Sequence, residues 1–182
     1  MPPTVEQFEE VITNLGNLYR QMGREEDALA CYNRALEAAP SHLPARVNKG
    51  RSLLAVSRLE EAITLYTEIL EALPEHANAR IGLAQSLQRS GQTRAATLHF
   101  EKALAHEPEN AAALNELGVM QEVSGRPKEA SRTLRRAVAS APTAPEMRTN
   151  LASALALSGE ETEAVSAYRE ALRLDPLNPE LH

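Results

Sequence analysis

The chain has 182 residues, of which 43% are hydrophobic and 24% charged, and its formal net charge is −6. This composition predicts a soluble globular protein and excludes binders that gain affinity for nucleic-acid phosphates from a basic excess. Aromatic residues make up 3% and tryptophan is missing, while alanine and leucine are abundant. Such a composition favours closely packed helices over a sheet, so we expect an all-α protein.

No pattern of chemistry-bearing residues predicts a cofactor or a catalytic site. Cys31 is the single cysteine, so an intrachain disulfide is impossible, and no Cys or His spacing indicates a metal site. Walker, dinucleotide and GxSxG motifs are missing. The N-terminus has no signal-peptide pattern and no segment approaches 18 apolar residues, so we expect a cytoplasmic protein without membrane insertion.

The first predicted element is a helix that starts upstream of the first repeat. Thr4 and Gln7 form a capping box, in which each side chain bonds a free backbone N–H of the first turn. Residues 1–8 are therefore predicted to extend the helix over 9–22.

A second helix is predicted over 26–39, antiparallel to the first. Each helix presents an apolar stripe at helical spacing, and we expect the two stripes to face each other. Small residues in the contact let the two helices approach closely. The stripes are Ile12, Leu15 and Tyr19 on the first helix and Ala28, Tyr32 and Ala35 on the second.

The same pattern returns every 34 residues along the chain. Prolines, small residues and large residues all keep this step without an insertion or deletion. The prolines are Pro40, Pro74, Pro108, Pro142 and Pro176, and the large residues are Tyr32, Tyr66, Phe100, Leu134 and Tyr168. Five repeats therefore form one predicted domain over 9–178, as 9–42, 43–76, 77–110, 111–144 and 145–178.

A left-handed residue is predicted after the first helix of each repeat. Glycine, which adopts this conformation without a Cβ clash, occupies the position as Gly23, Gly91, Gly125 and Gly159. Ser57 stands there in repeat two, so its turn is predicted to be the most strained of the five. Pro127 is predicted to begin the second helix of repeat four.

The last residues continue in phase with the repeats. Asn178 and Pro179 are predicted to cap and begin a helix, so 179–182 would start a truncated sixth repeat or a cap. Val165, Tyr168 and Leu172 then lack an obvious cover. One hypothesis is that this uncapped C-terminal end docks on another copy and gives a homo-oligomer; the other is that the chain is a segment of a longer protein.

This 34-residue pattern resembles that of the tetratricopeptide repeat family. The family pattern reads W-x2-L-G-x2-Y, then A-x3-F, then P over 34 residues. Repeat one carries it as Ile12, Leu15-Gly16, Tyr19, Ala28, Tyr32 and Pro40. The resemblance covers nearly the whole chain. It implies a right-handed α-solenoid of antiparallel helix pairs whose first helices line a concave groove for a peptide or protein segment.

The resemblance also implies which side chains face the groove, because the groove positions of each repeat share one helical face. Amides dominate this face. The predicted groove residues are Asn14, Asn17, Arg20, Asn48, Arg51, Asn78, Gln85, Arg89, Asn115, Glu116 and Asn150.

Asparagine recurs at the sixth position of the repeats, as Asn14, Asn48 and Asn150, with Gly82 and Glu116 as interruptions. This series is similar to the asparagine ladder of the O-linked N-acetylglucosamine transferase solenoid, where side-chain amides hold a peptide backbone. The alternative is that asparagine is simply tolerated on a solvated helix face.

The carboxylate clamp of chaperone-tail binders, another binding mode of the family, is not predicted. Asn17 and Asn48 match its asparagines, but Thr13, Asn78 and Gly82 stand where its cations lie.

Charge along the groove is uneven, with arginines in the first three repeats and glutamates in the last two. We expect a ligand of opposite polarity to be steered into one orientation, ordinary surface charge being the alternative. The charges are Arg20, Arg51 and Arg89, then Glu116, Glu122 and Glu146.

The sequence therefore predicts a non-catalytic adaptor or scaffold that binds a protein or peptide ligand. One alternative is the substrate-recognition region of a larger enzyme of the glycosyltransferase, sulfotransferase or hydroxylase type. A self-assembling scaffold is the other.

Overall fold

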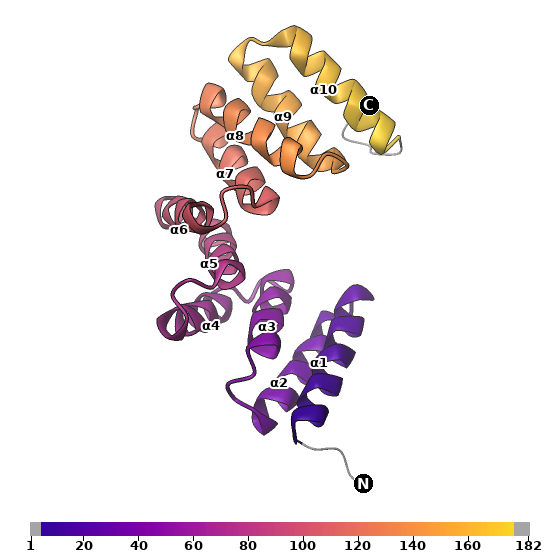
Figure 1. The fold of residues 1–182 in the computed structure, drawn as a ribbon, viewed down its shortest axis with the longest axis vertical. Helices are drawn as coiled ribbons and strands as arrows, with labels where there is room; N and C mark the ends of the chain where they lie inside the picture. Colours follow the sequence, from indigo (N-terminus) through magenta and orange to yellow (C-terminus); the bar gives the residue numbers. More distant parts are fainter. Residues whose placement is uncertain (1–4, 177–182) are drawn as a thin grey trace. The chain divides into compact units, whose positions relative to one another are not determined.

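The computed structural model describes residues 5–176, which form ten α-helices and no strand (Figure 1). This confirms the all-α prediction. None of the helices in this range is both long and apolar enough to cross a bilayer. The helices are α1 (Val5–Gln21), α2 (Glu25–Ala38), α3 (Leu43–Ala55), α4 (Leu59–Ala72), α5 (Ala77–Arg89), α6 (Thr93–His106), α7 (Ala111–Val123), α8 (Pro127–Ser140), α9 (Pro145–Ser158) and α10 (Glu161–Leu174).

Each repeat consists of two consecutive helices, which we name the A helix (α1, α3, α5, α7, α9) and the B helix (α2, α4, α6, α8, α10). The chain divides into two compact units, Met1–His99 and Phe100–His182, with the division inside α6. In unit one, α2 packs on α1 and α3, and α4 packs on α3 and α5; in unit two, α8 packs on α7 and α9, and α10 on α9. Thus α2, α4, α8 and α10 each touch their own A helix, and α2, α4 and α8 also touch the next one.

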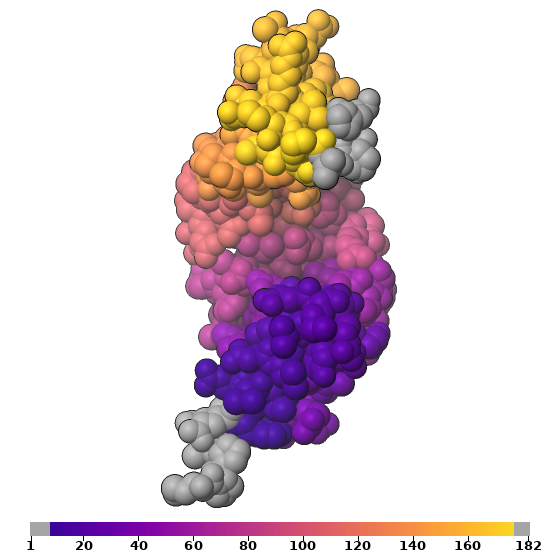
Figure 2. Space-filling view, turned by 90° about the vertical axis from the view of Figure 1, so that its right-hand side faces the viewer, coloured from indigo at the N-terminus to yellow at the C-terminus, as the bar shows by residue number. Residues whose placement is uncertain are grey.

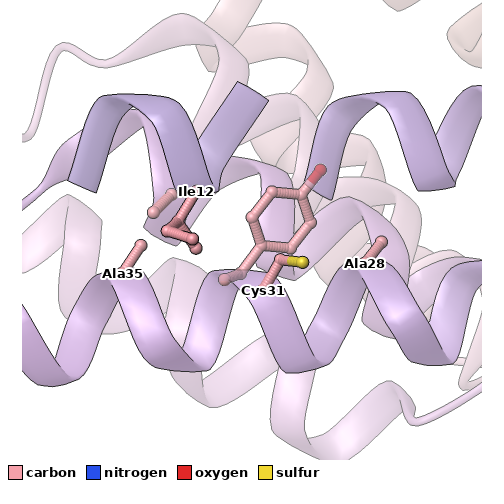
Figure 3. Packing of buried hydrophobic residues seen from close by; sticks show 6 residues of the cluster. Ile12, Ala28, Cys31 and Ala35 are labelled. Atoms are coloured by element: carbon pink, nitrogen blue, oxygen red, sulfur yellow. The ribbon is translucent and has the colours of Figure 1, made fainter. Parts of the chain in front are cut away.

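The core of repeat one lies between α1 and α2. Ile12 points from α1 toward the row formed by Ala28, Cys31 and Ala35 on α2 (Figure 3). Tyr32 is fully buried in the same cluster. Burying an aromatic side chain of this size contributes about 2–3 kcal/mol, so this one contact supplies much of the stability of the pair.

One part of the predicted stripe is wrong, because Leu15 does not face α2. Its side chain is 37% exposed, whereas Leu83 on α5 and Leu151 on α9, at the same repeat position, are buried. Those two helices each pack against the B helix of the preceding repeat. The position therefore serves contact between repeats, and α1 has no preceding B helix among the described residues.

Glycine in the A helices makes room for the large residue of the B helix. The fully buried ring of Tyr66 on α4 lies against Gly50 on α3 and Gly82 on α5. A Cβ atom would come within 2.4 Å of the Tyr66 Cζ atom at Gly50 and within 2.3 Å at Gly82. The Tyr66 hydroxyl donates to the Val47 carbonyl at 3.3 Å. Three helices of unit one therefore meet on this single ring.

The predicted turn conformations are confirmed. The four predicted glycines have positive φ, and Ser57 adopts the same left-handed conformation with φ of 63°. The backbone closes this turn in the usual way, with the Arg58 N–H donating to the Leu53 carbonyl at 2.9 Å. Ser57 therefore carries the steric cost that glycine avoids elsewhere. Pro127 begins α8, also as predicted.

Two predictions rest on side chains that lie outside the described residues. They are the capping box of Thr4 and Gln7 and the helix start at Asn178 and Pro179.

Replacing the strained serine should stabilise the protein. We expect Ser57→Gly, made in an Arg89→Ala background, to raise the free energy of unfolding by roughly 0.5–1 kcal/mol, because the left-handed penalty of an L-residue exceeds the entropy cost of glycine. The Arg89→Ala background is needed because the Ser57 hydroxyl otherwise accepts a hydrogen bond from Arg89, which glycine would lose. Urea denaturation followed by circular dichroism measures the change. Gly23→Ser is the reverse control, since no atom lies within 4 Å of its missing Cβ and only the backbone is affected. A loss of stability from Ser57→Gly in that background would contradict this account.

Adding one methyl group at Gly82 should destabilise the protein. In an open helix Gly→Ala gains about 1 kcal/mol, but the clash with Tyr66 should turn this into a loss of roughly 1–3 kcal/mol. The same denaturation experiment in a Tyr66→Leu background tests the cause, because leucine has no atoms where the Cε and Cζ atoms lie. The cost of Gly82→Ala should shrink there; an equal cost in both backgrounds would mean that the ring is not responsible.

Candidate functional site

The predicted groove residues lie on the A helices of both units, with different degrees of exposure. We name the exposed and half-buried ones the A-helix face. In unit one Asn14, Arg51, Asn78 and Arg89 are exposed, and Asn17, Arg20, Asn48 and Gln85 are half-buried. In unit two Glu116 and Asn150 are half-buried, whereas Asn115 is only 7% exposed and lies beneath the face.

Two predicted asparagines of unit one bond each other across the repeat boundary. The Asn17 Oδ1 atom on α1 accepts from the Asn48 Nδ2 atom on α3 at 2.8 Å. The same oxygen accepts from the Tyr32 hydroxyl, also at 2.8 Å. Asn17 thus joins α1, α2 and α3, and its acceptor is fully used inside the protein.

Two arginines bring positive charge to the same region. Burial raises the pKa of Tyr66 to about 12, and the nearby charges of Arg51 and Arg20 oppose this rise. Burial also raises the pKa of Tyr32, with Arg20 again opposing. The Arg20 Nε atom is buried and has no hydrogen-bond partner among residues 5–176. Arg20 therefore lies beside the Tyr32 hydroxyl, to which its side chain is hydrogen-bonded, and Arg51 is an exposed cation on the neighbouring A helix.

Arg89, the third arginine of the face, has a structural role. Its guanidinium donates to the Leu54 carbonyl near the end of α3 and to the Ser57 hydroxyl at 2.9 Å. A cation at this place satisfies a terminal carbonyl and favours the helix dipole. Arg89 therefore ties α5 to the strained turn, and its charge is less available to a ligand than that of Arg51.

The asparagine series is interrupted at Gly82 for a reason of packing. The Tyr66 ring fills the space that a side chain at this position needs. At Asn14, in contrast, the surface is hollowed, and Thr13, Asn14 and Asn17 line the hollow together with Glu9, Glu10, His42 and Pro44. In unit one the asparagine series therefore comprises Asn14 and Asn48 and has no member on α5; that it binds a peptide backbone stays a prediction.

Unit two has a related arrangement. The Asn150 Nδ2 atom on α9 donates to the Asn115 Oδ1 atom on α7 at 2.9 Å. Beside it the Ser153 hydroxyl donates to the Glu122 carboxylate, also at 2.9 Å. In both units, then, an asparagine at the sixth position of one repeat bonds an asparagine on the preceding A helix.

Sequence reasoning missed these pairs and the part of Tyr32 in them. The sequence separation of the asparagines could have indicated these pairs. The two asparagines of the first pair lie 31 residues apart and those of the second pair 35, and both separations are close to the 34-residue repeat length. Residues at that separation on neighbouring A helices of a stacked array are candidates for direct contact.

Comparison with protein families gives one assignment over most of the chain. A family model described as tetratricopeptide repeat matches residues 13–77, 81–130 and 123–179. A comparison with curated protein sequences gives no significant match.

Solved structures with the same fold include several bacterial proteins. TTC0263, a thermophilic TPR protein of Thermus thermophilus, superposes with a TM-score of 0.81 at 23% identity, over 95% of this chain and 94% of that one. The PilF protein of Pseudomonas aeruginosa superposes with a TM-score of 0.85 at 18% sequence identity, over 97% of this chain and 81% of PilF. YrrB, a TPR protein with an unusual peptide-binding site, superposes with a TM-score of 0.66 at 21% sequence identity, over 93% of this chain and 87% of YrrB. At these identities the likeness shows the fold alone.

The two asparagines of α1 should respond differently to substitution. Asn17→Ala leaves the buried Tyr32 hydroxyl and one Asn48 N–H without their acceptor, so we expect a loss of roughly 1–3 kcal/mol in the free energy of unfolding. Asn14→Ala, on the same helix but exposed, should stay within about 0.5 kcal/mol of the parent. Parallel urea titrations compare the two, and equal losses would show that the network is not stabilising.

Proposed function

The chain belongs to the tetratricopeptide repeat family, and from that premise we propose that it is a non-catalytic interaction module. Its ligand is a peptide or protein segment that lies along the A-helix face. In unit one the contacting residues are Asn14, Arg20, Asn48 and Arg51. YrrB carries a peptide-binding site on the same fold, which supports the proposal by analogy.

The observation that carries the proposal is the unused hydrogen-bonding capacity of Asn48. Its amide donates one hydrogen to Asn17, which leaves a second N–H and the carbonyl oxygen. The nearest cation, Arg51, reaches that oxygen only at 3.5 Å. An extended backbone presents alternating N–H and C=O groups, so an amide that donates and accepts at once can hold it without reading side chains.

The charges of unit one favour a ligand segment with acidic side chains. Arg51 is exposed, and Arg20, on the neighbouring A helix, is half-buried beside Tyr32. A carboxylate placed between them would form charge-assisted hydrogen bonds, which are stronger than neutral ones. We therefore propose a ligand whose backbone meets Asn14 and Asn48 and whose carboxylates meet Arg20 and Arg51.

Binding is tested with an array of short synthetic peptides, among which acidic sequences should be enriched. For the best binder, we expect Arg51→Ala to weaken the affinity measured by titration calorimetry about tenfold, because a hydrogen bond to a charged group contributes about 1.5 kcal/mol. The difference in affinity between the parent protein and Arg51→Ala should diminish as the salt concentration is raised.

Arg94→Ala is the matched control, because Arg94 is an equally exposed arginine on the B helix α6. It should bind the peptide as the parent does. No enrichment of acidic peptides, or equal losses in the two variants, would contradict the proposed site.

A further inference from the structure

Helix α1 carries an apolar stripe that no part of the described chain covers. Val11 is 64% exposed and Leu18 is 52% exposed, and Leu15 and Met22 continue the same row. The spacing of i, i+4 and i+7 puts Val11, Leu15 and Leu18 on one side of the helix, and Met22 follows directly after its end. In Figure 2 the indigo atoms of α1 lie open on the side that faces the viewer. Exposed apolar side chains that gather on one helix side mark an interaction surface.

Most counterparts of Val11, Leu15 and Leu18 in α3, α5 and α9 are buried, whereas Lys49 and Met147 are half-buried, as are the counterparts of Met22. Each of those helices packs against the B helix of the preceding repeat: α3 against α2, α5 against α4, and α9 against α8. The stripe on α1 therefore has the position of a surface that receives a B helix. The buried counterparts are Ala45 and Ser52 on α3, Ala79, Leu83 and Ser86 on α5, and Leu151 and Ala154 on α9.

Helix α10, the last B helix, has the complementary open face. Val165 is 49% exposed, whereas Ser131, at the same position of α8, is buried. Tyr168 is only half-buried, although its four counterparts Tyr32, Tyr66, Phe100 and Leu134 are all fully buried. In α2, α4 and α8 this face covers the A helix that follows. In the described residues no A helix follows α10.

We propose that α10 of one copy packs on α1 of a second copy and continues the repeat register between molecules. Within unit two, Leu134 and Val138 of α8 pack in one cluster with Leu151 and Ala154 of α9. The residues one repeat further along are Tyr168 and Leu172 on α10, and the A-helix positions that receive them are Leu15 and Leu18 on α1. The partner is thus this same chain, and the contact repeats an interface that the protein already contains.

Charges at the edge of the two faces agree with this register. On α8, Arg135 donates to Glu163 of the following B helix at 2.8 Å. The corresponding pair between two copies is Arg169 on α10 and Asp27 on α2, both exposed. Asp27 already bonds Arg24 at the surface and keeps a further oxygen for a second cation. This complementarity favours the C-terminal face of one copy over an unrelated apolar surface.

The side chains of α1 also fit an interface between separate molecules. Val11 and Leu18 are larger than the alanine or serine at these positions in α3 and α5. They bury more apolar surface per contact, and their volume would hold α10 farther from α1 than the corresponding helices lie from each other inside the protein. The two faces differ, so the contact is head-to-tail and produces chains of copies or closed rings.

Analytical ultracentrifugation of the full chain at rising concentration tests the inference. The parent protein should form species larger than a monomer. Leu18→Glu, which blocks the α1 face, and Val165→Glu, which blocks the α10 face, should each be monomeric. Mixed together, the two variants should form a heterodimer and nothing larger, because each retains the face that the other has lost.

Leu98→Glu is the matched control, since Leu98 is similarly exposed on α6 and belongs to neither face. It should assemble as the parent does, and circular dichroism should show all variants folded. A charge exchange tests the register: Arg169→Asp and Asp27→Arg should each weaken assembly and restore it when combined in one chain.

A parent protein that stays monomeric at every concentration would overturn the inference and leave the α1 stripe to a different protein. Failure of the mixed variants to pair, or assembly of either blocked variant, would also overturn it. Peptide binding by the A-helix face is measured separately, so each of these outcomes leaves the proposed function standing.

Discussion

The packing of a large B-helix residue against small residues of the A helices determines the geometry of each unit. Tyr66 is the clearest case, because its ring touches Gly50 and Gly82 on two different helices. The ring can fill this space only where Cβ atoms are missing, and its burial is what holds α3, α4 and α5 at their distances. The same relation appears between Gly16 and Tyr32 and, with a branched side chain, between Gly118 and Leu134.

Much of this fold could be predicted from the 34-residue period, since each recurring residue has a local physical reason. Positive φ at the turn glycines and at Ser57 follows from backbone sterics alone. The exposure of Leu15 could not be predicted in that way, because its position is buried only by a preceding repeat. Periodicity identifies which side of a helix is apolar, but a terminal repeat lacks a neighbour that every internal repeat has.

The candidate site was harder to predict than the fold. Helical spacing placed Asn14 and Arg51 on one helix face of the repeats, and both side chains are exposed. It could not reveal that Asn17 is saturated by two internal donors or that Asn115 is buried under Asn150. Those facts depend on how neighbouring repeats are spaced, and the spacing depends on side-chain volumes at several positions together. The absence of an asparagine at Gly82 has the same origin, because the Tyr66 ring occupies that place.

The bond between Asn17 and Asn48 means that, under the proposed function, the Asn48 amide would serve both the integrity of the array and its contact with a ligand. Over evolutionary time, such a residue resists change even when the partner changes, since its loss weakens folding as well as recognition. Asn14 and Arg51 are under no such double constraint, being exposed on the same face. A lineage of this protein that acquired a new partner would therefore record the switch at Asn14 and Arg51, while Asn17 and Asn48 stayed as they are.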